Sequence, residues 1–188
     1  MMGEREMYES LAKKFDQGIV AAPMSESLIE ILKILFPGEE AEIALKLPLE
    51  SKKIAKLKEL LDKEEQELVQ ILNRMAKRGT VFTEEISSGE TVYQLLPVVV
   101  GWSETPFWAG KDTETVRKLA PLWVKYREEG FGEELARNEM PLSRVIPISR
   151  SLKSDSEILP FDMLKSKLDK ISFFAVAHCP CRQMMRHN

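Results

Sequence analysis

The stretch that decides the fold is Lys52–Leu95, which reads KKIAKLKELLDKEEQELVQILNRMAKRGTVFTEEISSGETVYQL. Apolar residues recur at helical spacing over 52–61 and again over 63–78, where Asp62 and Glu65 have the spacing of a capping box. Gly79 then supplies the residue type that ends many helices, and the β-prone runs 80–83 and 91–95 flank a short polar turn. Helix, turn, helix, glycine and hairpin is the order of a winged helix-turn-helix, which we predict here.

Further helices are expected on both sides of this stretch. Before it, apolar spacing predicts helices over 7–15, from a cap at Ser25 or Ser27 to Phe36, and over 39–47. After it, Thr113 is placed to cap a helix that runs to Glu128 in a region rich in aromatic residues. These aromatic side chains either cover the winged-helix core or form a dimer interface, where Trp and Tyr concentrate. They are Trp102, Phe107, Trp108, Trp123, Tyr126 and Phe131.

The C-terminal quarter predicts a small α/β module. We expect a strand at 144–148, an extended stretch at 157–160, a helix at 161–168 and a buried strand at 171–177. The fold class is therefore α+β and mainly helical. We divide it into an N-terminal helix and loop (1–24), a winged-helix domain (25–97), a helical aromatic region (98–143) and the α/β module (144–188).

The only two cysteines, Cys179 and Cys181, follow directly on the predicted 171–177 strand. Closely spaced thiolates suit zinc and iron, so both residues are candidate metal ligands. Other interpretations stay open: two semi-buried thiols, a strained local disulfide, or a mononuclear site that recruits His178 and His187. Arg182 and Arg186 would help to hold thiolates or an anionic cluster.

Composition bounds the class of protein. Of 188 residues, 44% are hydrophobic and 30% charged, as in ordinary soluble globular proteins. The longest apolar run is far shorter than the roughly 20 residues of a membrane span, and the charged N-terminus does not resemble a signal peptide. With two cysteines and no disulfide framework, we expect a cytoplasmic protein without membrane association. Because catalytic sequence motifs are absent and both histidines lie near the end, we do not expect an enzyme.

The chain resembles ferredoxin-type 4Fe-4S proteins that carry an N-terminal winged helix. The resemblance rests on LIEILKILFPGEEAEIA at 28–44, LVQILNRMAKRG at 68–79, and ILPFD at 158–162 followed by CPCR at 179–182. It implies an iron–sulfur cluster in the intact protein, a redox partner protein, and a winged helix that couples cluster state to transcriptional regulation. In that family further cysteines follow the Cys-x-Cys-Arg sequence. None follows here, so we expect a shortened or short member in which the cluster is incomplete or absent.

The predicted second helix of the turn would be the recognition helix for double-stranded DNA. Its apolar stripe leaves Gln66, Gln70, Asn73 and Lys77 on an outward face beside Arg74, and amide side chains can read adenine edges. The lysines that could contact phosphates are Lys52, Lys53 and Lys56.

Charge opposes this interpretation. Residues 25–97 hold ten Lys and Arg against fourteen Asp and Glu, while 144–188 hold eight against four. The predicted wing carries Glu84, Glu85 and Glu90 but no basic residue, so phosphates would repel it. Use of the winged helix for protein docking or homodimerisation therefore stays open beside DNA binding.

Overall fold

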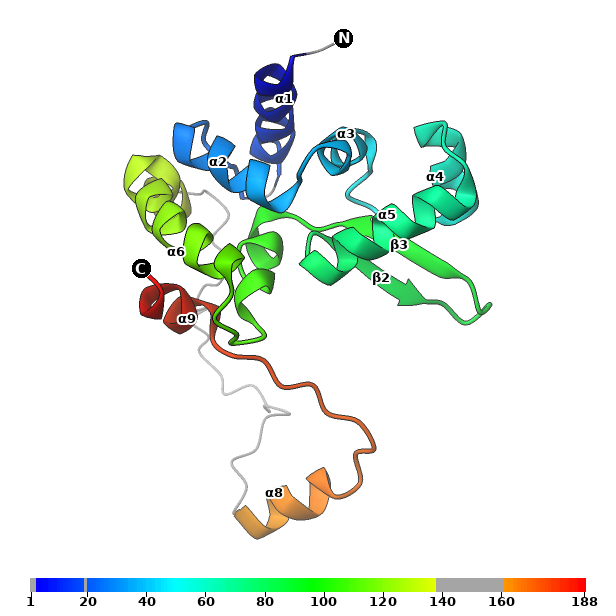
Figure 1. The fold of residues 1–188 in the computed structure, drawn as a ribbon. Coiled ribbons are helices and arrows are strands. Elements are labelled where there is room, and N and C mark those ends of the chain that lie inside the picture. Colours follow the sequence, from blue (N-terminus) through cyan, green and yellow to red (C-terminus); the bar gives the residue numbers. More distant parts are fainter. Residues whose placement is uncertain (1–2, 19, 138–160) are drawn as a thin grey trace, which may run out of the picture.

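A computed structural model describes residues 3–18, 20–137 and 161–188 (Figure 1). Its centre has the topology of a winged helix. β1 (Lys52–Lys53), α4 (Ile54–Leu61), α5 (Glu65–Arg78), β2 (Val81–Glu85) and β3 (Thr91–Leu95) follow one another along the chain. β3 lies between β1 and β2 in an antiparallel sheet, with Lys53 opposite Val92 and Val81 opposite Leu95. The fold is thus mainly helical α+β, as predicted.

Local chemistry explains where these elements end. Gly79 has a φ of 82° and stops α5, because its N–H can then bond the Met75 and Ala76 carbonyls. Gly89 has a φ of 79° in the hairpin turn. The expected capping box at Asp62 is wrong: Asp62 is the left-handed residue that ends α4, and α5 begins three residues later at Glu65, with Glu64 as its N-cap. The short polar side chain of aspartate can tolerate that conformation, and here it serves the turn rather than the next helix.

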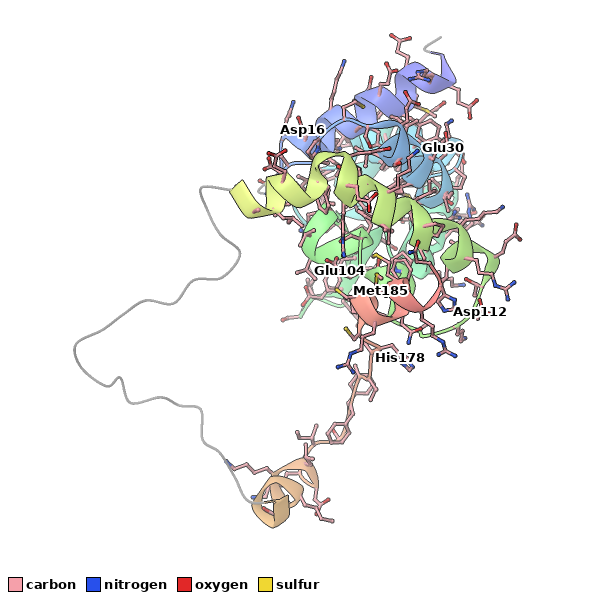
Figure 2. The ribbon with its side chains drawn as sticks, turned by 90° about the vertical axis from the view of Figure 1, so that its left-hand side faces the viewer. Asp16, Glu30, Glu104, Asp112, His178 and Met185 are labelled. Carbon is pink, nitrogen blue, oxygen red and sulfur yellow. The ribbon has the colours of Figure 1, made fainter. Side chains whose placement is uncertain are left out.

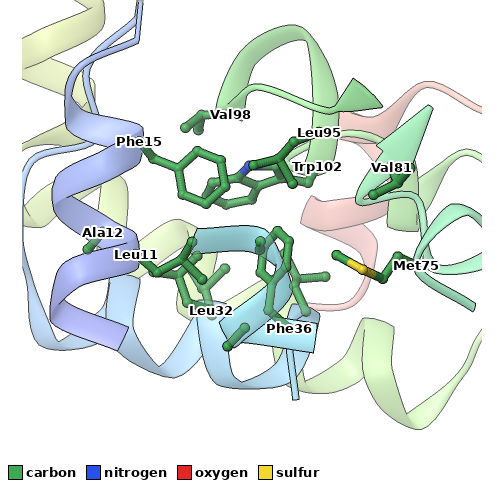
Figure 3. Close-up of a cluster of buried hydrophobic side chains, with 14 of the residues drawn as sticks. Leu11, Ala12, Phe15, Leu32, Phe36, Met75, Val81, Leu95, Val98 and Trp102 are labelled. Atoms are coloured by element: carbon green, nitrogen blue, oxygen red, sulfur yellow. The ribbon is translucent and has the colours of Figure 1, made fainter. Parts of the chain in front are cut away.

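Helices α1 (Glu4–Asp16), α2 (Glu26–Leu35) and α3 (Glu39–Lys46) precede the winged helix, and α6 (Glu114–Tyr126) follows it. Helix α1 packs against α2 and α3, α2 packs against α6, and α3 contacts α4 of the winged helix. Ser25 caps α2 by accepting from the Leu28 N–H at 3.1 Å, and Thr113 caps α6 by accepting from Val116 at 3.2 Å. One apolar cluster joins all these elements, with Phe15, Phe36 and Trp102 near its middle (Figure 3). The three predicted divisions 1–24, 25–97 and 98–143 therefore share one apolar core.

The aromatic region belongs to that core. Trp102, Trp123 and Tyr126 are at most 1% exposed, and Trp123 lies 5.6 Å from Trp102 between ring centroids. For every ring of this group except Trp108, burial favours the core over a dimer interface. Of the aromatic residues named above, only Trp108 remains substantially exposed, at 40%. The turns η1 (Val98–Trp102), η2 (Thr105–Phe107) and η3 (Arg127–Phe131), with α7 (Gly132–Arg137), complete the region.

The C-terminal part only partly matches its prediction. α8 (Phe161–Leu168) is present, and Figure 1 shows it apart from the rest of the fold. The strand expected at 171–177 is wrong: the segment forms neither strand nor helix and has no strand partner among the described residues, with Phe173 81% and Val176 93% exposed. Its apolar composition alone cannot form a strand, because a strand needs a hydrogen-bonded neighbour. A short helix, α9 (Pro180–Arg186), follows instead. The expected strand at 144–148 and extended stretch at 157–160 lie outside the described residues.

Within the described ranges, no helix combines the length and apolar character needed to cross a membrane.

Candidate metal centre and nucleic-acid interface

The two cysteines lie at the start of α9. Cys179 is the residue before the helix, Pro180 is its first residue, and Cys181 follows in the first turn. Proline favours this position because its missing N–H has no helical partner there in any case. Both thiols are free and exposed. A pair of thiols in this position is accessible to a metal ion, and the local fold contributes no disulfide between them.

The helix that carries these thiols rests on the aromatic core. Met184 is 3% exposed, and together with Cys181 it lines a cavity of about 120 Å³ beside Trp123 and Phe131. At the far end of α9, His187 Nδ1 lies 3.5 Å from Asp112 Oδ1. The Arg117 guanidinium, bound to the same carboxylate, holds the pKa of Asp112 below its usual range. Figure 2 shows α9 against the body of the fold, with His178 where the chain leaves it.

His178 fixes the approach to the thiols. Its backbone N–H donates to the Trp108 carbonyl at 2.9 Å, and its ring lies over Gly110, whose φ of 62° and missing Cβ make room for it. Its Nδ1 is 3.4 Å from Gln183 Nε2. Among the described residues no cluster of three or more His, Cys, Asp or Glu side chains could hold a metal ion. Cys179 and Cys181 could therefore supply only half of a four-thiolate set. Because the chain has only these two cysteines, the other thiolates would come from outside these 188 residues.

The outward face of α5 agrees with its prediction. Gln66, Gln70, Asn73 and Lys77 are exposed, opposite the buried stripe of the helix. Arg74 is half exposed beside them. Amide groups and a lysine therefore form a continuous polar row along the helix, and this row is available to a partner.

Most of the basic residues predicted to contact phosphates are already paired with carboxylates of this protein. Lys52 pairs with Glu50 at 2.7 Å, Lys56 with Glu59 at 2.8 Å, and Arg74 lies 3.8 Å from Glu40. Such exposed pairs are weak and could exchange for phosphates. Because each ion pair is neutral, the excess of Asp and Glu over Lys and Arg in residues 25–97 still gives the winged helix a negative net charge.

The wing itself is tied to the first strand. Lys53 pairs with Glu90 at 2.6 Å and holds the pKa of that carboxyl below its usual range. Lys77 makes no ion pair with any of the described residues. Among the basic residues predicted to contact DNA, Lys77 is therefore the one that could bind a phosphate without first breaking an ion pair with a described carboxylate.

A groove beside β2 was not predicted from the sequence. It has a volume of about 510 Å³ and lies between the end of α5, β2, η2 and the start of α6. Its lining includes Phe82 and Trp108, which are 47% and 40% exposed, and also Lys77. The signal in the sequence was Phe82, a large aromatic residue among polar ones in a predicted strand.

Comparison with protein-family models, with curated proteins and with solved structures gives no match for this chain.

Proposed function

We propose that this chain is a non-catalytic protein that contributes Cys179 and Cys181 to an iron–sulfur cluster and uses its winged helix to convey the state of that centre to a partner. The observation that carries the proposal is the position of the two free thiols at the start of α9, a helix anchored on the same core as the winged helix. When bound, such a cluster exchanges electrons. The chain's own residues hold and orient the thiols.

The winged helix then serves as a protein-docking surface. Its exposed cations are largely paired with carboxylates, and Glu84, Glu85 and Glu90 are exposed on the wing. A surface of this charge favours a basic partner, such as an electron-transfer protein that presents lysines or arginines. Free exposed thiols persist in a reducing compartment, so the proposal includes a cytoplasmic location.

Anaerobic reconstitution tests the thiolate centre. The chain is incubated with iron, sulfide and an excess of a small monothiol, which supplies the thiolates that the chain lacks. We expect iron to stay with the protein after desalting, with visible thiolate-to-iron absorption, and both signals to fall for Cys179→Ser and Cys181→Ser. His187→Gln is the control, because it removes the alternative imidazole ligand and should change neither signal. Iron retention that survives the double cysteine substitution would contradict the proposal, and so would its absence in the unaltered chain.

DNA binding is the second candidate, favoured by the exposed row of Gln66, Gln70, Asn73 and Lys77. In this case a homodimer would place two α5 helices about one duplex turn apart on a palindromic site. Selection from random duplexes at low salt, with and without iron loading, tests it. Gln70→Ala or Asn73→Ala should relax base preference at a cost of about 1–3 kcal/mol each. Lys52→Ala should weaken all sequences alike. If no duplex is enriched in either form, only protein docking remains.

A further inference from the structure

The outer edge of β2 is open. β3 separates β2 from β1, so in the part of the chain that the structure describes nothing pairs with the other side of β2. An open edge presents backbone N–H and C=O groups in a row, ready to accept another strand. The groove beside it leaves Phe82 and Trp108 half exposed. This edge therefore lacks both a hydrogen-bonded neighbour and an apolar cover.

Residues 171–177, ISFFAVA, also lack a hydrogen-bonded neighbour and an apolar cover among the described residues. Ile171 is 48% exposed, Phe173 81% and Val176 93%, although the composition is that of a buried strand. No backbone hydrogen bond joins residues 172–177 to any other described residue. The segment is thus neither helix nor strand, with a bend at Ser172, and requires the same kind of partner that β2 lacks.

Covalent and hydrogen-bonded anchors place the segment at the mouth of this groove. Its last residue precedes His178, whose N–H is bonded to the carbonyl of Trp108, a lining residue. β2 begins at the same end, because the Gly79 carbonyl accepts from Thr105 Oγ1 at 2.6 Å and both residues line the groove. The C-terminal end of the segment therefore lies near the N-terminal end of β2. A fold-back from this anchor runs antiparallel to β2, as the rest of the sheet does.

Charge agrees with that direction. In an antiparallel arrangement with Val176 opposite Phe82, the exposed Lys170 lies opposite Ser88, in the hairpin turn just beyond Glu84 and Glu85. Opposite charges at that end favour this pairing over the parallel one, which would place Lys170 beside Lys77 and Arg78.

We propose that residues 171–177 close onto the free edge of β2 as a fourth, antiparallel strand that covers the groove. Closure buries Phe82, Trp108 and one face of the segment, and it satisfies the open backbone groups of β2 together with the alternate groups of the segment that face β2. Because Lys77 and Arg78 line the groove, closure also covers the C-terminal end of α5. The closed segment thereby forms a physical link between the residues next to Cys179 and the exposed face of the winged helix. This link does not require a bound metal.

Hydrogen exchange on the unaltered chain tests closure directly. A segment that is closed most of the time exchanges its amides at least about tenfold more slowly than an open chain. We expect this protection at alternate amides of residues 172–177, those that face β2, at every protein concentration, and its reduction in Lys170→Glu. Exchange at the rate of an open chain would overturn the proposal. Protection that grows with protein concentration would overturn it too, by assigning the strand to a second copy.

Disulfide trapping gives an independent measurement. Phe82→Cys and Val176→Cys are combined in a Cys179→Ser, Cys181→Ser background and treated with oxidised glutathione. Both altered residues are exposed in the open form, so the fold should tolerate them. We expect an intramolecular disulfide in the monomer. The matched control pairs Val176→Cys with Leu60→Cys, which is 50% exposed on α4 and contributes nothing to the groove. A disulfide-linked dimer, or equal trapping in the control, would contradict closure within one chain.

Discussion

Glu40 is a buried carboxyl that is only partly compensated. Its Oε1 lies 3.3 Å from Arg78 Nη2, whereas its Oε2 is buried without a hydrogen-bond partner among the described residues. Burial raises the pKa of Glu40 above its ordinary 4.5, although Arg78 and Arg74 act in the opposite direction. The folded state therefore binds this proton more tightly than the unfolded state does, and stability falls as pH rises from 4.5 through the folded pKa.

Replacement of Glu40 tests this sign. We expect Glu40→Gln to be more stable than the unaltered chain at neutral pH, because the amide carries no charge that burial would penalise. Urea unfolding at several pH values should show the advantage shrinking toward pH 4.5. Glu42→Gln is the control, because it removes an exposed charge from the same helix. A difference that does not change with pH would show that Glu40 folds in its charged form without cost.

Lys14 has a structural role that the apolar spacing of its own helix does not predict. Its Nζ donates to the carbonyls of Ala44, Leu45 and Leu47 at 2.6, 2.9 and 2.6 Å, and so satisfies the end of α3. We expect Lys14→Met to lower the free energy of unfolding by about 1–3 kcal/mol, because three acceptors lose their donor. Lys13→Met, at an exposed neighbouring position, should have little effect in the same urea titration. Equal losses in both variants would mean that the three hydrogen bonds contribute nothing.

Among the elements, α9 depends on one side chain for its stability. A helix of seven residues does not persist alone in water, so its anchor on the aromatic core decides whether it forms. Met184 is 3% exposed and Met185 is 60% exposed, which makes the two methionines a matched pair. We expect Met184→Ala to release the amide protection of residues 183–187 while global unfolding changes much less. Met185→Ala should leave hydrogen exchange unchanged. Protection that survives Met184→Ala would locate the anchor elsewhere, for example at His187 and Asp112.

The contrast between α5 and 171–177 shows what a local pattern can predict. The stripe of Leu68, Ile71, Leu72 and Met75 defines a helix by itself, so the exposure of Gln70 and Asn73 on its other face follows from spacing alone. The apolar run 171–177 indicates a strand but not its neighbour, and a strand exists only with one. The pairing of Lys53 with Glu90 was equally hidden, because the two residues meet only once β1 and β3 are side by side.

For the molecule as a whole, burial separates the two interpretations of the aromatic region. Trp123 packs 5.7 Å from Tyr126 and 6.0 Å from Phe131 between ring centroids, inside the chain rather than on its surface. An interface residue would couple stability to protein concentration, because dissociation precedes or accompanies its exposure. A core residue lowers stability by the same amount at every concentration.

We therefore expect Trp123→Ala to lower the free energy of unfolding by about 3–5 kcal/mol, the cost of a large cavity, with a urea midpoint that does not depend on protein concentration. Trp108→Ala, at the exposed ring, should cost far less. Trp123→Phe should lose less than the alanine variant, because the indole Nε1 has no hydrogen-bond partner among the described residues and only ring area is reduced. Two results together would contradict this prediction: a midpoint that rises with protein concentration in the unaltered chain, and a midpoint that no longer does so in Trp123→Ala. They would show that Trp123, and the face of α6 that carries it, lie in an interface.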